Sequence, residues 1–171
     1  MENILQKIQL LLLDVDGVLT DGSIVYTDAG EQIKSFNSKD GLGLRLLMDA
    51  GVGVGIVTGR TSGALLHRCN NLGIEMIFDG IKDKAQAFNT IVDKTGISSE
   101  HIAFMGDDLM DLPAMVRAGI SFTVADAPKE VIANADLVMD MPGGQGAVRL
   151  ACETILKARG DWDKIVSGFL S

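Results

Sequence analysis

The apolar positions of this chain fall into short blocks that alternate with longer amphipathic stretches. The block Leu10-Leu11-Leu12-Leu13, followed by Val15, has no polar position on either face, which is typical of a strand buried on both sides of a parallel sheet. Later apolar blocks predict further strands at residues 52–57, 76–78, 102–105, 120–124 and 137–139. Because strands and helices alternate at this spacing, the sequence predicts a doubly wound, Rossmann-like α/β fold with helices on both faces of a parallel sheet.

Amphipathic spacing and boundary residues place the helices between these strands. Leucines between residues 42 and 47 give the first helix its apolar side, and Gly51 ends it. Residues 1–7 are expected to be a polar lead, and the end of the chain, with Trp162 and Phe169, a polar tail. Other helices are expected to end near residue 72, to span about 82–95 and 147–157, and to begin near Pro113 and Pro128.

One insertion breaks the alternation of strands and helices. Residues 23–36 contain two β-prone runs around the turn Asp28-Ala29-Gly30, which predicts a small β-hairpin. Its aromatic and aliphatic residues need a surface to cover, and an ordinary ribbon would cover its own domain. With 171 residues, 47% hydrophobic content and 3 prolines, the chain can build one compact domain over residues 1–171.

Charge and cysteine content exclude several functions. The net charge of −8 and the pI near 4.6, without a basic stripe, argue against nucleic-acid binding. Cys69 and Cys152 are too few and too distant for a disulfide framework or a zinc cluster, so we expect buried thiols and a reducing compartment, the cytoplasm. Asp14 and Asp16 interrupt the N-terminal apolar run, so we expect neither a signal peptide nor a membrane span.

Polar side chains gather where predicted strands end or predicted helices begin. Because the carboxyl ends of parallel strands share one edge of a sheet, we expect these clusters to converge. Several carboxylates offer hard oxygen ligands that suit Mg²⁺, and the lack of a His/Cys cluster argues against zinc. A cation, a lysine and a hydroxyl can hold a phosphoryl group while a carboxylate acts as nucleophile. The clusters are Asp14 with Asp16, Thr58 with Arg60, Lys84, and Asp107 with Asp108 and Asp111.

The order of these motifs resembles that of the haloacid dehalogenase superfamily of phosphatases. A narrower resemblance, to the family of 3-deoxy-D-manno-octulosonate 8-phosphate phosphatases, implies a magnesium-dependent branch without a cap domain. It implies hydrolysis of this eight-carbon sugar-acid phosphate to the free sugar acid and phosphate, in lipopolysaccharide precursor synthesis. The motifs that carry the narrower resemblance are Thr20-Asp21-Gly22, Gly30-Glu31, Asp40-Gly41, Thr58-Gly59-Arg60 and the segment from Gly143 to Arg149.

The resemblance also implies a role for each acid of the motifs. Asp14 would be the nucleophile and would form an aspartyl-phosphate intermediate. Asp16 would first protonate the leaving sugar oxygen and then activate the hydrolytic water, as microscopic reversibility requires. Magnesium would bind the Asp14 side chain, the Asp16 backbone carbonyl and Asp107. Asp108 and Asp111 would support the lysine and the metal shell.

The remaining motif residues would bind the substrate. By resemblance, Thr58 and Lys84 would hold the phosphoryl oxygens. Arginines suit a carboxylate substrate because their planar guanidinium groups can bind it through two hydrogen bonds. Contacts to the phosphorylated sugar acid would come from Asp16, Asn37, Ser38, Lys39, Asp40, Gly41, Arg60, Arg68 and Lys84.

The inserts between motifs are too short for a separate cap domain, because the residues between Gly17 and Thr58 accommodate only a hairpin and a helix. Phosphoryl transfer benefits from the exclusion of water, so an open site would need a covering surface. The related family forms tetramers. The resemblance therefore implies a homotetramer in which the hairpin packs on a neighbouring subunit and closes the site.

Several alternatives stay open. Asp79, Ser38-Lys39 and Leu150 depart from the family pattern, and a nine-carbon sugar-acid phosphate is the nearest competing substrate. A receiver domain also uses an aspartate, magnesium, a threonine and a lysine, but its phosphorylated aspartate follows the third strand. A catalytically silent module with this fold is another alternative. Taken singly, several residues also have simpler roles as a helix cap, a solvated helix residue or a first-turn acid: Thr58, Lys84, Arg68 and Asp111.

Overall fold

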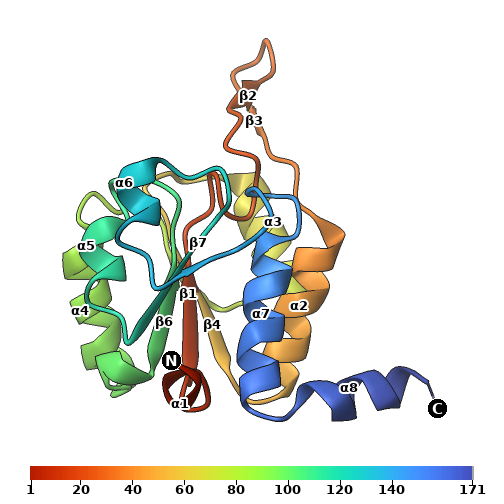
Figure 1. The fold of residues 1–171 in the computed structure, drawn as a ribbon. Helices are drawn as coiled ribbons and strands as arrows, with labels where there is room; N and C mark the ends of the chain where they lie inside the picture. The colour runs from red at the N-terminus through yellow and green to blue at the C-terminus, as the bar shows by residue number, and fades with distance from the viewer. Residues whose placement is uncertain (171) are drawn as a thin grey trace.

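The computed structural model describes residues 1–170 and builds them around a six-stranded parallel sheet (Figure 1). The strands lie in the order β5-β4-β1-β6-β7-β8, which places β1 between β4 and β6. The adjacent strands of this sheet pair in parallel. Their bounds are β1 (Leu10–Leu13), β4 (Gly53–Val57), β5 (Met76–Phe78), β6 (Ile102–Met105), β7 (Ile120–Thr123) and β8 (Leu137–Val138).

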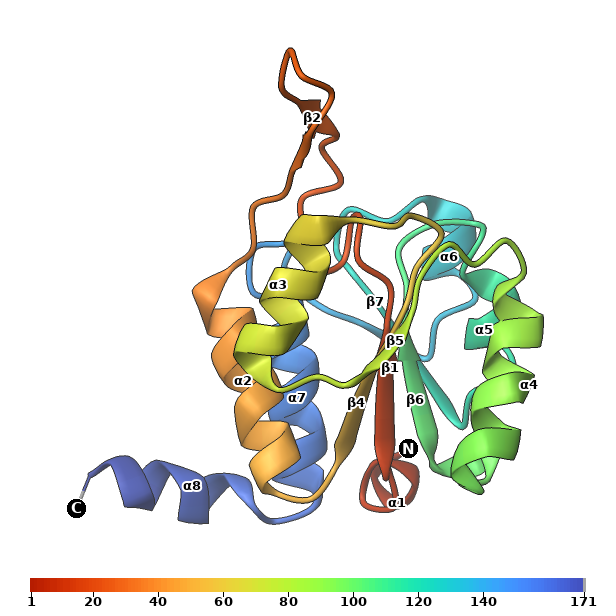
Figure 2. The ribbon, with the colours of Figure 1, turned by 180° about the vertical axis from the view of Figure 1, so that it is seen from behind.

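Helices cover both faces of the sheet, as predicted. The two ribbon views show α2, α3 and α7 on one face and α4 and α5 on the other (Figures 1 and 2). The doubly wound α/β class is thus confirmed, and within residues 1–170 the insertion after β1 holds a hairpin and not a cap domain. The helices are α1 (Glu2–Leu5), α2 (Ser38–Asp49), α3 (Gly63–Leu72), α4 (Lys84–Thr95), the 3₁₀ helix η1 (Ser99–His101), α5 (Leu112–Met115), α6 (Lys129–Ile132), α7 (Ala147–Ala158) and α8 (Trp162–Phe169).

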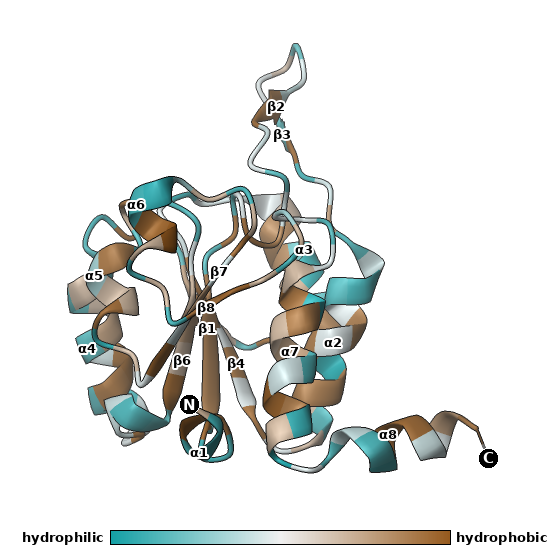
Figure 3. Ribbon diagram, in the orientation of Figure 1, coloured by the Kyte–Doolittle hydropathy of each residue, from teal (hydrophilic) through white to brown (hydrophobic). Residues whose placement is uncertain are grey.

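The leucines of β1 form the centre of the core. Leu11, Leu12 and Leu13 have 0% exposure, and β1 pairs with β4 on one side and with β6 on the other. Burial of each such side chain contributes roughly 1.5–3 kcal/mol to folding. Hydrophobic residues dominate the strands (Figure 3). Cys69 and Cys152 are buried free thiols, as the sequence predicts.

Side-chain caps determine where two helices begin. Asn37 precedes α2 and accepts a hydrogen bond from the Lys39 backbone N–H. Asp83 precedes α4 and accepts one from the Gln86 N–H. Such caps satisfy backbone donors that have no partner within the helix. Lys84 consequently occupies the first position of α4, immediately after its cap.

The predicted hairpin is present, but it does not cover its own domain. Its strands β2 (Val25–Tyr26) and β3 (Gln32–Ile33) pair antiparallel, and residues 23–36, here called the β-arm, project from the body (Figures 1 and 2). Val25, Tyr26 and Ile33 are all about half exposed. The simpler alternative, an ordinary ribbon folded onto its own domain, does not fit these exposures.

Two terminal segments also differ from the sequence-based expectation. The expected polar lead contains the short helix α1, and the expected polar tail contains α8, which extends away from the body (Figure 1). Trp162, Ile165 and Phe169 do recur at helical spacing, but charged residues lie between them, and these favour the prediction of a polar tail. None of the helices within residues 1–170 is long and apolar enough to span a membrane.

A buried carboxylate connects α2 to α7. Asp40 is only 1% exposed, and its Oδ1 accepts a hydrogen bond of 2.8 Å from the Arg149 N–H in the first turn of α7. Gly146 precedes α7 and has no side chain to cap it, so Asp40 serves this purpose from another helix. Burial raises the pKa of Asp40, while hydrogen bonds from the backbone of Arg149 and Gly146 oppose the rise.

Replacing Asp40 with alanine is expected to lower the free energy of unfolding by about 1–2 kcal/mol, because α7 loses its cap. Chemical denaturation of the purified protein would measure the change. Asp49→Ala, at the exposed far end of the same helix, is the matched control and should leave stability nearly unchanged. Equal stability of the two variants would contradict the capping role.

Candidate active site

The carboxyl ends of β1, β4 and β6 lie side by side at one edge of the sheet. Asp14 follows β1, Thr58 follows β4, and Asp107 comes shortly after β6. The chain runs from β1 to β4 on one side and places β6 on the other, and such switch points form crevices that bind ligands. The predicted convergence of these motifs therefore follows from the topology.

Lys84 lies between two carboxylates at this edge. Its Nζ is 2.9 Å from Asp14 Oδ1, and it also donates a hydrogen bond to Asp111 Oδ1. The lysine side chain is only 4% exposed, and a charge this deeply buried needs compensation. Burial lowers the pKa of Lys84, but the charges of Asp14 and Asp111 outweigh it, so the net shift is upward. Lys84 is thus a fixed positive charge.

Asp111 shapes the loop that follows β6. Its Oδ2 accepts hydrogen bonds from the backbone N–H groups of Asp107, at 3.0 Å, and of Asp108, at 3.2 Å. Its Oδ1 accepts the hydrogen bond from Lys84. Because both oxygens already have protein partners, Asp111 is suited to hold the loop and the lysine in place. This arrangement supports the predicted supporting role, which stays a prediction.

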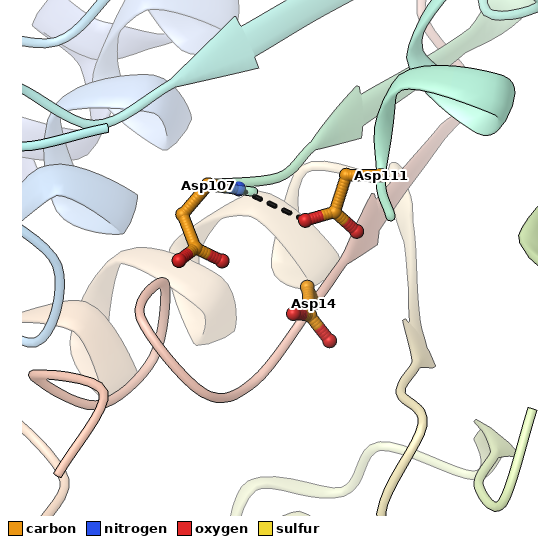
Figure 4. Close-up of side chains that lie close together, drawn as sticks. All are labelled: Asp14, Asp107 and Asp111. Carbon is orange, nitrogen blue, oxygen red and sulfur yellow. Dashed lines mark hydrogen bonds between the residues drawn. The ribbon is translucent and has the colours of Figure 1, made fainter. Parts of the chain in front are cut away.

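The carboxylates of Asp14, Asp107 and Asp111 point toward one another (Figure 4), with oxygen atoms within 4.8 Å. Among the described residues, Asp107 Oδ1 is buried without a hydrogen-bond partner. Gly17 has a φ of 93°, and a Cβ at this position would overlap the Asp107 carboxylate. An all-oxygen set with an unsatisfied buried oxygen fits a hard divalent cation such as Mg²⁺. Asp14 and Asp107 are the acids best placed to bind it directly.

Burial and mutual repulsion perturb both of these acids. Burial raises the pKa of Asp107 to about 8, and the charges of Asp111 and Asp14 add to the effect. Burial and Asp111 raise the pKa of Asp14 to about 6, against the opposing effect of Lys84. Negative charge therefore exceeds positive charge in this cluster, and a bound divalent cation would offset the excess.

A cavity of about 470 Å³ opens at the same edge of the sheet, in the size range of small-molecule sites. All of the residues predicted to be catalytic line it. Thr58 is buried at its wall, and Arg60 is more exposed, with Nε 3.7 Å from Asp16 Oδ2. The lining consists of Asp14, Asp16, Thr58, Gly59, Arg60, Lys84, Asp108 and Met110.

The residues predicted to contact the sugar do not all reach this cavity. Arg60 lines it, and Ser38 and Lys39 are exposed at the start of α2. A separate hollow of about 10 Å³, room for about one water, is lined by others of the set. Contact between the residues at this hollow and the sugar stays a prediction, since the single chain does not bring them to the cavity. These residues are Asn37, Asp40, Gly41 and Arg68.

Lys34 is a candidate functional residue that the sequence pattern did not reveal. It follows β3 in the β-arm and forms an ion pair with Asp16 Oδ1. A lysine in a β-prone run usually faces solvent, so the local pattern carried no signal. Only the antiparallel return of the β-arm brings Lys34 back to the end of β1.

Comparison with known proteins identifies the family. Residues 74–149 match the family model of haloacid dehalogenase-like hydrolases. The 3-deoxy-D-manno-octulosonate 8-phosphate phosphatase KdsC of Salmonella typhi is 43% identical over 159 residues, which are 93% of this chain and 85% of that protein. The chain belongs to this phosphatase family. The superfamily and the narrower family suggested by the sequence motifs are thereby confirmed.

Solved structures of family members share the fold. The phosphatase of Moraxella catarrhalis, in complex with magnesium ion, phosphate ion and KDO, is 39% identical with a TM-score of 0.96, over 98% of this chain and 97% of that one. The cobalt-bound phosphatase of Haemophilus influenzae is 42% identical with a TM-score of 0.94, over 98% and 99%. The doubly wound fold is thus that of these phosphatases.

The raised pKa of Asp107, about 8, predicts how divalent-cation binding depends on pH. In the metal-free protein the folded state holds this proton more tightly than the unfolded state, so stability should fall as pH rises from about 4 to about 8. Mg²⁺ must displace the proton, so the increase in Tm on adding Mg²⁺ should be larger at about pH 8.5 than at about pH 6. Thermal unfolding with Mg²⁺ and with chelator would measure both.

Asp107→Asn is the control for this prediction, because it removes the titrating group while keeping its size. The variant should lose most of the Mg²⁺-dependent increase in Tm and the pH dependence that goes with it. A Mg²⁺ effect that is the same at both pH values in the unmodified protein would contradict the assignment of Asp107.

Proposed function

We propose that this chain hydrolyses 3-deoxy-D-manno-octulosonate 8-phosphate to the free sugar acid and phosphate, with Mg²⁺ as cofactor. The observation that carries the proposal is the cavity where Asp14, Asp16, Thr58 and Lys84 meet beside Asp107. The 43% identity to the phosphatase of this name supports the substrate. The Moraxella catarrhalis relative, which binds magnesium, phosphate and KDO, supports both substrate and cofactor.

The acidic cluster provides the metal site of this proposal. The side chains of Asp14 and Asp107, with the Asp16 backbone carbonyl, would hold Mg²⁺, and Asp108 would belong to its surroundings. When bound, the ion neutralises and orients the phosphoryl oxygens. Asp111 would act indirectly, because its oxygens already hold Lys84 and the loop after β6.

Asp14 is the nucleophile in this mechanism. A bond would form between its carboxylate oxygen and phosphorus while the bond from phosphorus to the sugar oxygen breaks, leaving an aspartyl-phosphate. Asp14 must be ionised to attack, and Lys84 at 2.9 Å favours that state against burial. Lys84 and Thr58 would hold the phosphoryl oxygens, since both line the cavity.

Asp16 is the general acid and base. In the first step its carboxyl proton would move to the departing sugar oxygen, and in the second its carboxylate would take a proton from the attacking water. Its side chain is 18% exposed and lines the cavity, so both a sugar oxygen and water can reach it. Arg60, at the same wall, is suited to the sugar-acid carboxylate.

Asp14→Asn is expected to reduce kcat by at least about 10⁴-fold, the scale on which loss of a catalytic nucleophile acts in other hydrolases. Phosphate release from eight-carbon and nine-carbon sugar-acid phosphates, measured with Mg²⁺, would test activity and substrate together. The Tm should not fall, because the substitution removes a negative charge that is repelled by Asp111.

Asp140→Asn, at an exposed position, is the matched control and should retain full turnover. Substantial residual activity of Asp14→Asn would reject the nucleophile. Faster turnover of the nine-carbon substrate by the unmodified enzyme would replace the proposed substrate but keep the mechanism.

A neighbouring subunit is also part of this proposal. The apolar side chain of Met110 lines the cavity and is 61% exposed, and the β-arm carries exposed apolar side chains that its own domain leaves uncovered. Exposed apolar patches on two parts of one chain favour contact between copies. We therefore include a homotetramer in which the β-arm of one subunit covers the site of another. We also propose a cytoplasmic location, where the two free thiols stay reduced.

A polar substitution on the β-arm tests this assembly. Tyr26→Glu is expected to reduce the mass of the assembly in light scattering and to lower kcat/KM by about tenfold, because an uncovered site positions its substrate less well. Glu31→Gln, also exposed on the β-arm, should change neither. A fully active monomeric wild type would reject the covering subunit.

A further inference from the structure

The side chain of Lys34 is almost completely buried although the residue belongs to a projecting arm. Its side chain is 2% exposed, whereas the neighbouring Ile33 is 52% exposed. A lysine amine is very rarely buried without a partner of opposite charge. The partner that the structure gives it is Asp16 Oδ1, with which it forms both an ion pair and a hydrogen bond.

The contact from Lys34 dominates the environment of the Asp16 carboxylate. Within the described part of the chain, the other cation paired with Asp16 is Arg60, at 3.7 Å from Oδ2, and its side chain is 53% exposed. Exposed ion pairs at this distance contribute little, because solvent screens them and the side chain is mobile. Lys34 is buried and hydrogen-bonded, so it is the group that limits where the Asp16 carboxylate can point.

The contact also closes the base of the β-arm. The 18 positions that separate Asp16 from Lys34 include the whole antiparallel pair of β2 and β3. One end of the arm therefore continues from the loop that carries Asp16, and the other end is attached to the Asp16 side chain. A change in the seating of the arm must move Lys34, and with it the carboxylate.

We propose that Lys34 is a positioning residue that aims the Asp16 carboxyl group at the departing oxygen and connects this acid–base group to the β-arm. The inference rests on the proposed function of Asp16. It assigns to the arm a second task besides covering a neighbouring site. Lys34 itself transfers no proton and touches no substrate in this proposal.

Leaving-group dependence distinguishes positioning of an acid from a general structural role. An alkyl phosphate such as 3-deoxy-D-manno-octulosonate 8-phosphate has a poor leaving group and needs the Asp16 proton, whereas p-nitrophenyl phosphate has a good one and needs it little. Lys34→Met should lower kcat on the sugar phosphate by roughly tenfold to a hundredfold, the range in which a general acid contributes. The loss on p-nitrophenyl phosphate should be less than about threefold.

Three further variants make this test specific. Lys34→Arg keeps the cation and should restore most of the rate on the sugar phosphate. Lys34→Met added to Asp16→Asn should cause no further loss, because two residues that act through one step are not additive. Lys7→Met removes an exposed lysine before β1 and should leave both rates unchanged.

Equal losses on the two substrates, or a full further loss in the Asp16→Asn background, would overturn the positioning role. If Lys34→Met does not fold, the same comparison is made with Lys34→Arg, as the ratio of kcat on the sugar phosphate to kcat on p-nitrophenyl phosphate. A reduced kcat on both substrates with an unchanged ratio would count against the proposal. Failure of the proposed function would look different, since the unmodified enzyme would then release no phosphate from the sugar acid. The Lys34 ratio would in that case be measured on an alkyl phosphate that the unmodified enzyme does hydrolyse.

Discussion

The arrangement of this molecule depends on compensating several acids at the end of a strand that is buried on both faces. The leucines of β1 fix that strand in the core, so Asp14 emerges at a buried edge and has no freedom to move into solvent. Lys84, 2.9 Å from Asp14 and hydrogen-bonded to Asp111, holds this charge array together, because removal of the lysine would leave both acids buried and without a cation. The excess of negative charge in this cluster opposes folding, but the same carboxylates provide ligands for a cation.

The β-arm also compensates an acid near the edge of the sheet, and it connects that acid to the surface of the molecule. An insertion that follows the first strand could have packed on its own domain, but Val25, Tyr26 and Ile33 stay about half exposed, and the buried side chain of Lys34 returns to Asp16. The arm is thus attached at its base by an ion pair, and its apolar side chains farther out stay exposed. In the proposed homotetramer, such a segment would contact a neighbouring subunit while its base remains beside Asp16, and it would connect assembly to this acid without a separate cap domain.

The parts of the fold that could be predicted are those that depend on short-range patterns of apolar and polar residues. The run Leu10–Leu13 specified a buried strand, and the acids after it could be assigned to one edge because parallel strands end together. Lys34 could not be found this way, since its contact depends on how far the arm returns toward Asp16. The family resemblance implies a sugar contact for Asp40, which stays a prediction, whereas its hydrogen bond with the distant N-terminus of α7 could not be foreseen from its motif. Local pattern therefore predicted the helices and strands and the edge at which the acids gather, while long-range contacts decided what individual polar residues touch.

The overall charge of the protein makes the local cations at this edge necessary. A chain with a net charge of −8 would repel the proposed sugar-acid phosphate at long range, so attraction would have to arise at short range inside the cavity. Lys84 and Arg60 line that cavity, but Asp14 and Asp111 already take up much of the charge of Lys84. In the proposed function, a cation held at the unsatisfied oxygen of Asp107 would therefore aid substrate binding as well as catalysis, because it would add the positive charge that the protein itself does not supply. Cation and phosphate must then favour each other's binding, since each offsets the charge that opposes the other.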